Sequence, residues 1–207
     1  MAKNDERLGT APLGKLMLSM ALPTVTAQII NVLYNIVDRI YIGHIEGYGQ
    51  LALTGVGVTF PIIMLISAFS AFAGMGGAPL ASIELGRQDV RKAELILGNS
   101  AGMIVLFSVV LTVGFSIFKR PVLYAFGASD VTVEYAASYI GIYLIGTIFV
   151  QVAVGLNTFI SGQGESKTAM LSVVIGAVLN IVLDPILIFG LDMGVRGAAL
   201  ATVISQA

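Results

Sequence analysis

Six apolar runs, separated by short charged or glycine-rich stretches, occupy almost the whole chain. Each of the first five is long enough for a helix of about 20 residues, the length that crosses a bilayer. We therefore predict an all-α integral membrane protein with six transmembrane helices, at about 15–43, 51–83, 92–118, 132–162, 167–190 and 195–207. The sixth run is cut off by the end of the sequence, so its helix is predicted as truncated.

Proline and glycine modify individual helices. Pro23 lies inside the first run and removes a backbone donor, so a kink is predicted between Ser19 and Pro23, either as a fixed bend or as a hinge. Residues 47–83 are uncharged and are predicted to form one helix with a loosened end. Within it, the glycine-rich stretch 74–79 lacks the Lys-Ser/Thr pair of a phosphate-binding loop. It indicates close helix packing or a helix break.

Polar side chains form a stripe along the first helix. At 100° per residue, they fall within an arc of about 80°, and they are Gln28, Asn31, Asn35 and Asp38. Such a stripe faces protein or water rather than lipid. Asp38 ends the stripe and is interpreted either as part of a polar site or as a boundary residue paired with the adjacent Arg39.

The fifth run contains the most costly polar residue. Asp184 interrupts an otherwise apolar stretch, and Asn180 lies one turn before it on the same helix face. An ionised carboxylate in the middle of a membrane span costs about 2.5–3.5 kcal/mol on insertion scales unless it faces a polar interior. Asp184 is therefore a functional candidate, and its partners must come from other helices.

Composition narrows the class of function. Hydrophobic residues make up 57% of the chain and charged residues 11%, and the net charge of -1 leaves no excess of basic residues for nucleic acid. Without Cys there is no disulfide framework, and the single His44 is interpreted as an interfacial residue. No nucleophile lies beside a base and no phosphate loop is present. An enzyme is therefore not expected, and no cofactor is predicted.

The distribution of Lys and Arg predicts the orientation. With the N-terminus in the cytosol, seven basic residues are cytosolic (Lys3, Arg7, Lys15, Arg87, Arg91, Lys92 and Lys167). Four are then outside (Arg39, Lys119, Arg120 and Arg196). The positive-inside rule favours this arrangement. Residues 1–14 are then a cytosolic tail, residues 15–207 form the transmembrane lobe, and the expected location is the plasma (inner) membrane.

Four polar residues fall at a similar depth in this topology. Asp38, Asp184 and Thr202 each lie roughly 7–9 Å from the outer end of their helix, at 1.5 Å per residue, and Asn180 lies one turn deeper. Two carboxylates, an amide oxygen and a hydroxyl suit a hard monovalent cation such as Na⁺, or a shared proton. The same oxygens serve both ions, so the coupling ion stays open between Na⁺ and H⁺.

Further polar and aromatic residues are candidates for lining a substrate cavity. They are Gln28, Asn31, Tyr34, Asn35, Tyr139, Tyr143 and Asn157. Amide and aromatic groups bind many organic cations. Tyr139, Tyr143 and Asn157 share one face if residues 135–164 form a single helix.

The chain resembles the first half of a multidrug and toxic compound extrusion (MATE) transporter. The resemblance covers nearly all of the chain. The stretches that carry it are Pro23, 35–44, 162–164, 180–190 and 197–202, with their Asn-Ile-Val-Asp-Arg, Gly-Gln-Gly, Asn-Ile-Val-Leu-Asp-Pro and Gly-Ala-Ala-Leu-Ala-Thr sequences.

The resemblance implies two six-helix lobes around a central cleft, and export of organic, mainly cationic, compounds against Na⁺ or H⁺ entry. It implies an N-terminal cation site at Asp38, Asn180, Asp184 and Thr202, with Tyr139 near it and Pro23 at a bend of the first helix. Members of the family have about twelve spans. We therefore interpret this chain as one lobe, whose partner is a C-terminal six-helix lobe or a second copy of the chain.

Two other interpretations stay open at this point. Six spans also suit a self-assembling channel or small exporter, which would form a homo-oligomer and need no counter-ion. Alternatively, the Asp residues are structural and hydrogen-bond across helices to Asn31, Asn35 or Thr202.

Overall fold

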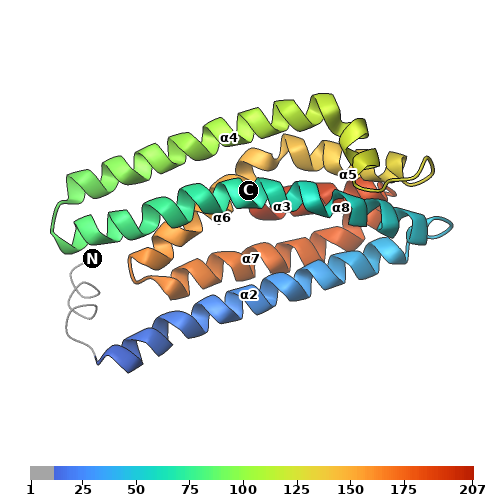
Figure 1. The fold of residues 1–207 in the computed structure, drawn as a ribbon. Coiled ribbons are helices and arrows are strands. Elements are labelled where there is room, and N and C mark those ends of the chain that lie inside the picture. The colour runs from blue at the N-terminus through green and yellow to red at the C-terminus, as the bar shows by residue number, and fades with distance from the viewer. Residues whose placement is uncertain (1–11) are drawn as a thin grey trace.

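The computed structural model describes residues 12–207 and is helical, with short connections (Figure 1). The helices are α2 (Leu13–Gly43), α3 (Gly49–Gly86), α4 (Val90–Ala125), α5 (Val133–Ile145), α6 (Thr147–Gly162), α7 (Ser166–Pro185), the π-helical turn η1 (Ile186–Gly190) and α8 (Val195–Gln206). Most of the predicted tail 1–14 lies outside the described residues.

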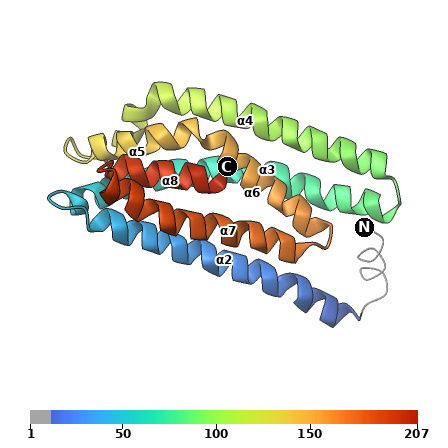
Figure 2. The same cartoon turned by 180° about the vertical axis from the view of Figure 1, so that it is seen from behind.

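The helices run back and forth between two ends of an elongated bundle (Figures 1 and 2). We call the end with the connections 44–48, 126–132 and 191–194 the distal end, and the end with 87–89 and 163–165 the proximal end. Between residues 12 and 207, four helical segments are long and apolar enough to cross a membrane: α2, α3, α4 and α7 with η1. The bent pair α5 and α6 makes a fifth if it is one span.

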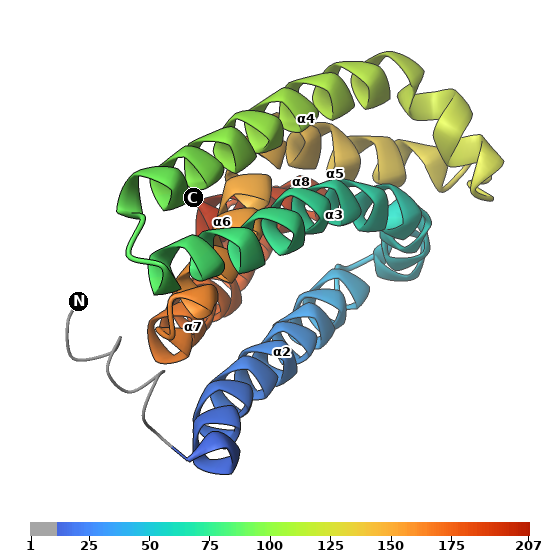
Figure 3. The same ribbon diagram turned by 60° about the vertical axis from the view of Figure 1, so that its left-hand side comes forward.

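α2 is set apart from most of the bundle. It packs chiefly along α7, and together they form one side, while α4 lies on the other side beyond α3 and α6 (Figure 3). α8 is short and lies between α5 and α7. The core has two parts, a larger one at the distal end around Ile62, Ile66 and Ile140, and a smaller one around Ala78 and Phe159 towards the proximal end.

The helix predicted over 132–162 is two helices in the structure. α5 and α6 meet at Gly146 with a bend of 61°. A Cβ atom at Gly146 would collide with the side chain of Val203 on α8, so α8 packs directly against the break. The bend therefore depends on a contact 57 positions away in the chain, and the helical period of 133–164 contains no sign of it.

The helix predicted to end at residue 118 continues to Ala125. Its backbone is distorted at Phe118 (φ -99°, ψ 16°), three residues before Pro121. Pro121 cannot donate to the carbonyl of Ile117, which accounts for a local distortion rather than a helix end. Lys119 and Arg120 thus lie on the distal continuation of α4 rather than in a loop.

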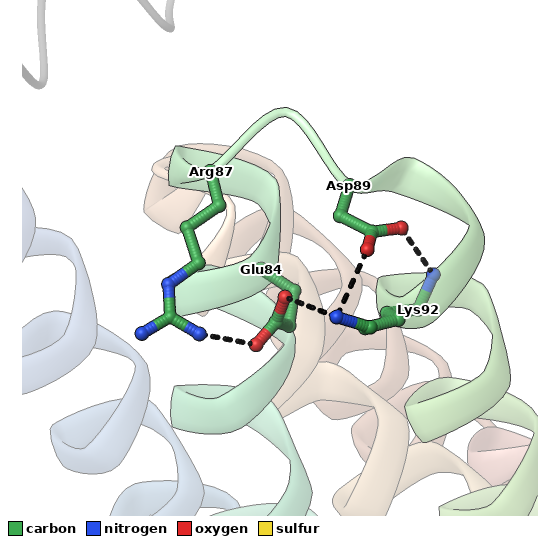
Figure 4. Close-up of polar contacts among 4 residues, drawn as sticks. All are labelled: Glu84, Arg87, Asp89 and Lys92. Carbon is green, nitrogen blue, oxygen red and sulfur yellow. Dashed lines mark hydrogen bonds and ion pairs between the residues drawn. The ribbon is translucent and has the colours of Figure 1, made fainter.

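The charged turn between α3 and α4 closes the proximal end (Figure 4). Glu84 pairs with Arg87 at 2.9 Å, and Lys92 pairs with Asp89 at 3.2 Å. Asp89 also accepts a hydrogen bond from the backbone N–H of Lys92 and caps α4. That backbone bond, with the Lys92 ammonium, lowers the pKa of the Asp89 carboxyl. These solvent-exposed pairs contribute little stability, and they keep the turn polar.

Small residues bring α3 close to α6. A Cβ atom at Gly74 would lie 2.6 Å from the backbone oxygen of Gly155. At Gly77 it would collide with Ser100 of α4 and Phe159 of α6. α3 continues without interruption to Gly86. Of the two readings of the stretch 74–79, the structure therefore has close helix packing and not a helix break.

We expect Gly74→Ala to destabilise the protein by about 1–3 kcal/mol, because the added methyl group overlaps backbone atoms that cannot move aside. The control is Gly76→Ala, on the same helix, where a Cβ atom meets nothing within 4 Å. It should be neutral or stabilise by up to about 1 kcal/mol through helix propensity. Thermal unfolding of the purified protein in detergent measures both, and equal effects would contradict close packing at Gly74.

Candidate functional site

α7 carries two buried polar residues on one face. Asn180 and Asp184 are both 0% exposed and lie four residues apart, one turn along the helix. Pro185 follows directly and cannot donate to the carbonyl of Ile181. The π-helical turn Ile186–Gly190 begins there, closed by a bond from the Leu191 N–H to the Ile186 carbonyl. The backbone beside Asp184 is thus irregular, as is common at functional sites in helices.

α2 contributes the second carboxyl group. Asp38 is 7% exposed on a helix that is otherwise largely exposed, because its side chain is turned towards the rest of the bundle. The carboxyl groups of Asp38 and Asp184 lie within interaction range of each other. Neither Asp184 oxygen, however, has a partner with hydrogen-bond geometry among the described residues. The structure therefore brings together two acidic residues that are 146 positions apart in the chain.

Five atoms of these three side chains are buried without a hydrogen-bond partner in residues 12–207. They are one oxygen of Asp38, both oxygens of Asp184, and the amide oxygen and nitrogen of Asn180. A buried polar group without a partner costs about 1–3 kcal/mol, and a charged group costs more. Native structures rarely leave so many together. Four of these five atoms are oxygens, and such a group of oxygens fits a bound cation or a shared proton.

Tyr139 connects Thr202 with the acidic pair. The Thr202 hydroxyl donates to the Ala198 carbonyl of its own helix at 3.0 Å, so its oxygen still has accepting capacity. The buried Tyr139 of α5 lies within interaction range of both Asp38 and Thr202. Tyr139 thus links Thr202 of α8 with Asp38 of α2, and Asp184 of α7 lies within range of Asp38.

Arg39 lies within electrostatic range of Asp38, but neither alternative for the Asp residues shows a direct contact in residues 12–207. Arg39 forms no ion pair with Asp38 within the described part of the chain, and its guanidinium lies 5.5 Å from the ring centre of Phe60. The Asp residues make no hydrogen bond to Asn31, Asn35 or Thr202. The Asn35 amide donates instead to the Asn31 carbonyl of its own helix.

The proposed cavity residues divide into three groups. Tyr139 and Tyr143 are buried and stack with ring centres 6.4 Å apart, and Tyr34 lies within interaction range of both Asp residues. Gln28 and Asn35 are exposed on α2, and Asn31 is half-buried. Asn157 is separate, because the break at Gly146 places it on α6 rather than on the helix of Tyr139.

Asn157 has clear structural partners. Its amide nitrogen donates to the Ala169 carbonyl at 3.0 Å and to the Ser172 hydroxyl at 2.8 Å, both on α7. These bonds tie α6 to α7 towards the proximal end. They occupy the amide nitrogen of a residue that we expected to face a cavity.

Sequence reasoning missed the buried amide of Gln151. Gln151 on α6 is 0% exposed, and neither polar atom of its amide has a partner among the described residues. The Ser70 hydroxyl of α3 donates to the Gln151 backbone carbonyl at 2.7 Å. An amide in the uncharged run 135–164 was a signal for a buried polar position, but at 100° per residue Gln151 lies about 120° from the predicted polar face of Tyr139 and Asn157.

Comparison with known proteins connects this geometry with a family. The MatE family model matches residues 23–186, which include Pro23, Asp38, Asn180 and Asp184. The multidrug export protein MepA of Staphylococcus haemolyticus is 30% identical over 193 residues, which are 93% of this chain and 42% of MepA.

Solved structures show the same similarity in three dimensions. A MATE protein in the bent conformation matches with a TM-score of 0.89 and 31% identity, over 99% of this chain and 45% of that protein. A MATE protein in the straight conformation matches with a TM-score of 0.84 and 31% identity, over 93% of this chain and 42% of that protein. The chain thus spans less than half the length of the relatives that it matches.

We expect Asn157→Ala to destabilise the protein by about 1–3 kcal/mol, because it leaves the Ala169 carbonyl and Ser172 hydroxyl without their amide donor. Asn31→Ala is the matched control, since the Asn31 side chain forms no hydrogen bond with the described residues, and it should change stability by less than about 0.5 kcal/mol. Melting temperatures in detergent provide the comparison. An unchanged melting temperature for Asn157→Ala would contradict its structural role.

Proposed function

Because the chain belongs to the MatE family of membrane transporters, we propose that it is the cation-binding lobe of a cation-coupled antiporter. The family consists of multi-pass membrane transporters rather than enzymes, and MepA is a multidrug export protein. The resemblance found in the sequence is thereby confirmed at the level of the family. The coupling ion, the substrates and the role of this lobe are our proposals.

One observation carries the proposal: the group of unpartnered oxygens at Asp38, Asn180 and Asp184. Two carboxylates in one buried region repel each other when both are ionised, and each has lost its hydration. A bound Na⁺ or a proton offsets both costs. We propose that Asp38 and Asp184 carry the ion, that Asn180 adds its amide oxygen and that Thr202 adds its hydroxyl.

The position of Asp38 on α2 suggests how ion binding is coupled to transport. An ion held between Asp38 and Asp184 stabilises the contact between α2 and α7, and its loss releases α2. Pro23 lies inside α2 and leaves the Ser19 carbonyl without its helical donor, so it is our candidate for the bending point. Structures of related MATE proteins have been solved in a bent and in a straight conformation, which supports a helix with two stable conformations. The ion and the substrate then act on the same equilibrium between two conformations of α2.

For the substrate we propose small organic cations. The candidate residues near the ion site are Tyr34, Tyr139 and Tyr143, with Gln28, Asn31 and Asn35 along α2. Aromatic faces attract organic cations, and the two acidic residues add negative charge. Asn157 is left to its structural role. A substrate cation near Asp38 would compete with the coupling ion for the negative charge. This competition would produce exchange of the substrate for the ion.

We further propose that the chain forms a six-helix lobe with a cytosolic N-terminus in the plasma membrane. Transport then requires a second lobe, either a C-terminal six-helix lobe or another copy of this chain. A self-assembling channel is the weaker proposal, because the relatives named above are roughly twice as long and MepA is an export protein.

We expect Na⁺ to stabilise the full-length protein against thermal unfolding, by about 2.7 kcal/mol when Na⁺ is at a hundred times its Kd. Asp38→Asn and Asp184→Asn should abolish the effect. Asp192→Asn is the matched control, at an exposed distal position whose φ of 53° suits Asn. Stabilisation by Na⁺ that survives in the Asp38→Asn/Asp184→Asn double variant would rule out Na⁺ at this site and leave a proton.

The transport proposal is tested by efflux of a fluorescent organic cation from cells that make the full-length protein. Na⁺ and pH gradients are imposed separately, and the gradient that drives efflux identifies the coupling ion. Asp38→Asn and Asp184→Asn should reduce efflux to the background of cells without the transporter, whereas Asp192→Asn should not. Efflux that needs neither gradient, or that persists in both Asp variants, would contradict the antiporter.

A further inference from the structure

A basic pocket lies at the distal end, outside the candidate ion site. It is open to the surface, has a volume of about 340 Å³, and is lined by residues of α4, α5 and α8. Its size falls within the roughly 300–1,000 Å³ of small-molecule sites. The distal parts of these three helices lie together in both views of the bundle (Figures 1 and 2).

Three cationic side chains from two helices line this pocket. Lys119 and Arg120 come from α4 beyond the distortion at Phe118, and Arg196 comes from the first turn of α8. The lining contains one carboxylate, Glu134 of α5, which pairs with Arg120 at 2.7 Å. Lys119 and Arg196 have no ion-pair partner in residues 12–207. The pocket therefore has a surplus of positive charge without an internal counter-ion.

Lys119 lies close to α5 at the wall of the pocket. A Cβ atom at Gly141 of α5 would lie 3.3 Å from the Lys119 ammonium nitrogen, so the ammonium group lies against the backbone of α5. The hydroxyl-bearing Ser138 lies one turn away on the same helix and also lines the pocket. A ligand in this space would meet two free cationic groups and a neutral hydrogen-bonding group.

Exposed apolar side chains continue from the pocket towards the middle of the bundle. Ile117 precedes Arg120 by one turn on α4 and is 68% exposed, and Ile145 follows Gly141 by one turn on α5 and is 78% exposed. Where such an exposed apolar side chain faces the membrane, it contacts lipid acyl chains. The surface thus combines a basic pocket with exposed apolar side chains next to it.

We propose that this pocket binds the phosphate group of an anionic phospholipid whose acyl chains lie along α4 and α5. Lys and Arg side chains bind phosphate oxygens through charge-assisted hydrogen bonds, and in the topology proposed above this pocket meets lipids of the outer leaflet. Free phosphate shares the charged group but makes no use of Ile117 and Ile145. A bound lipid would hold the distal ends of α4, α5 and α8 together.

The experiment is native mass spectrometry of the full-length protein from detergent micelles that contain phosphatidylglycerol or phosphatidylcholine at equal concentration. Wild-type protein should retain phosphatidylglycerol preferentially. The double variant Lys119→Gln/Arg196→Gln should bind it roughly 30-fold more weakly, at about fivefold for each charge near the membrane surface. Arg91→Gln/Lys167→Gln removes two charges at the proximal end and should leave binding unchanged.

Two further measurements distinguish lipid binding in the pocket from general surface attraction and from binding of free phosphate. Ser138→Trp keeps every charge but fills the pocket, and it should also abolish the preference for phosphatidylglycerol. Retention in Ser138→Trp would mean general surface attraction and would overturn the proposal. Inorganic phosphate at millimolar concentration should not displace the lipid. Displacement by phosphate, or charge-dependent binding of phosphate without a lipid preference, would assign the site to the free anion instead.

Discussion

Burial of two carboxyl groups in one apolar bundle is the constraint on which the arrangement of α2, α7 and α8 depends. Asp38 and Asp184 lie within interaction range of each other and lack compensating hydrogen bonds in residues 12–207. Apolar packing alone would favour replacing them, because an uncompensated buried charge costs several kcal/mol. Uptake of a positive ion by the lobe would account for their presence. Without the ion the two carboxyl groups raise the free energy of this arrangement, and binding of the ion lowers it. That difference would couple ion binding to movement of α2.

Close contacts among the other helices would confine this movement to α2. α3 and α6 approach each other through Gly74 and Gly155, and contacts this close leave little room for sliding. α2 makes such a close approach to α3 at its distal end, where Gly43 meets Gly49. It packs mainly along α7, and most of its large apolar side chains are exposed. A helix that is attached mainly along one neighbour can move as a unit with fewer broken contacts, which suits a two-state switch.

The two sites that we propose use opposite electrostatics at the same end of the bundle. The ion site is buried and acidic, whereas the pocket at Lys119, Arg120 and Arg196 is open and basic. Both contact α5 and α8, since Tyr139 of α5 adjoins Asp38 and Thr202, and Ser138 and Arg196 line the basic pocket. Lipid bound at the pocket would therefore act on the same two helices that border the ion site.

The amino-acid sequence by itself determined the class of the protein, most of the helices and the polar residues from which we propose the ion site. Long uncharged runs specify helices in a membrane, and Asp38, Asn180 and Asp184 stand out because polar groups in such runs are costly. Only the tertiary structure decided the break at Gly146, the engagement of Asn157 with α7, and the meeting of Lys119 with Arg196 in one pocket. Helical periodicity reports neighbours three and four positions apart. These features depend instead on which helices pack together and on contacts as distant in sequence as Gly146 and Val203.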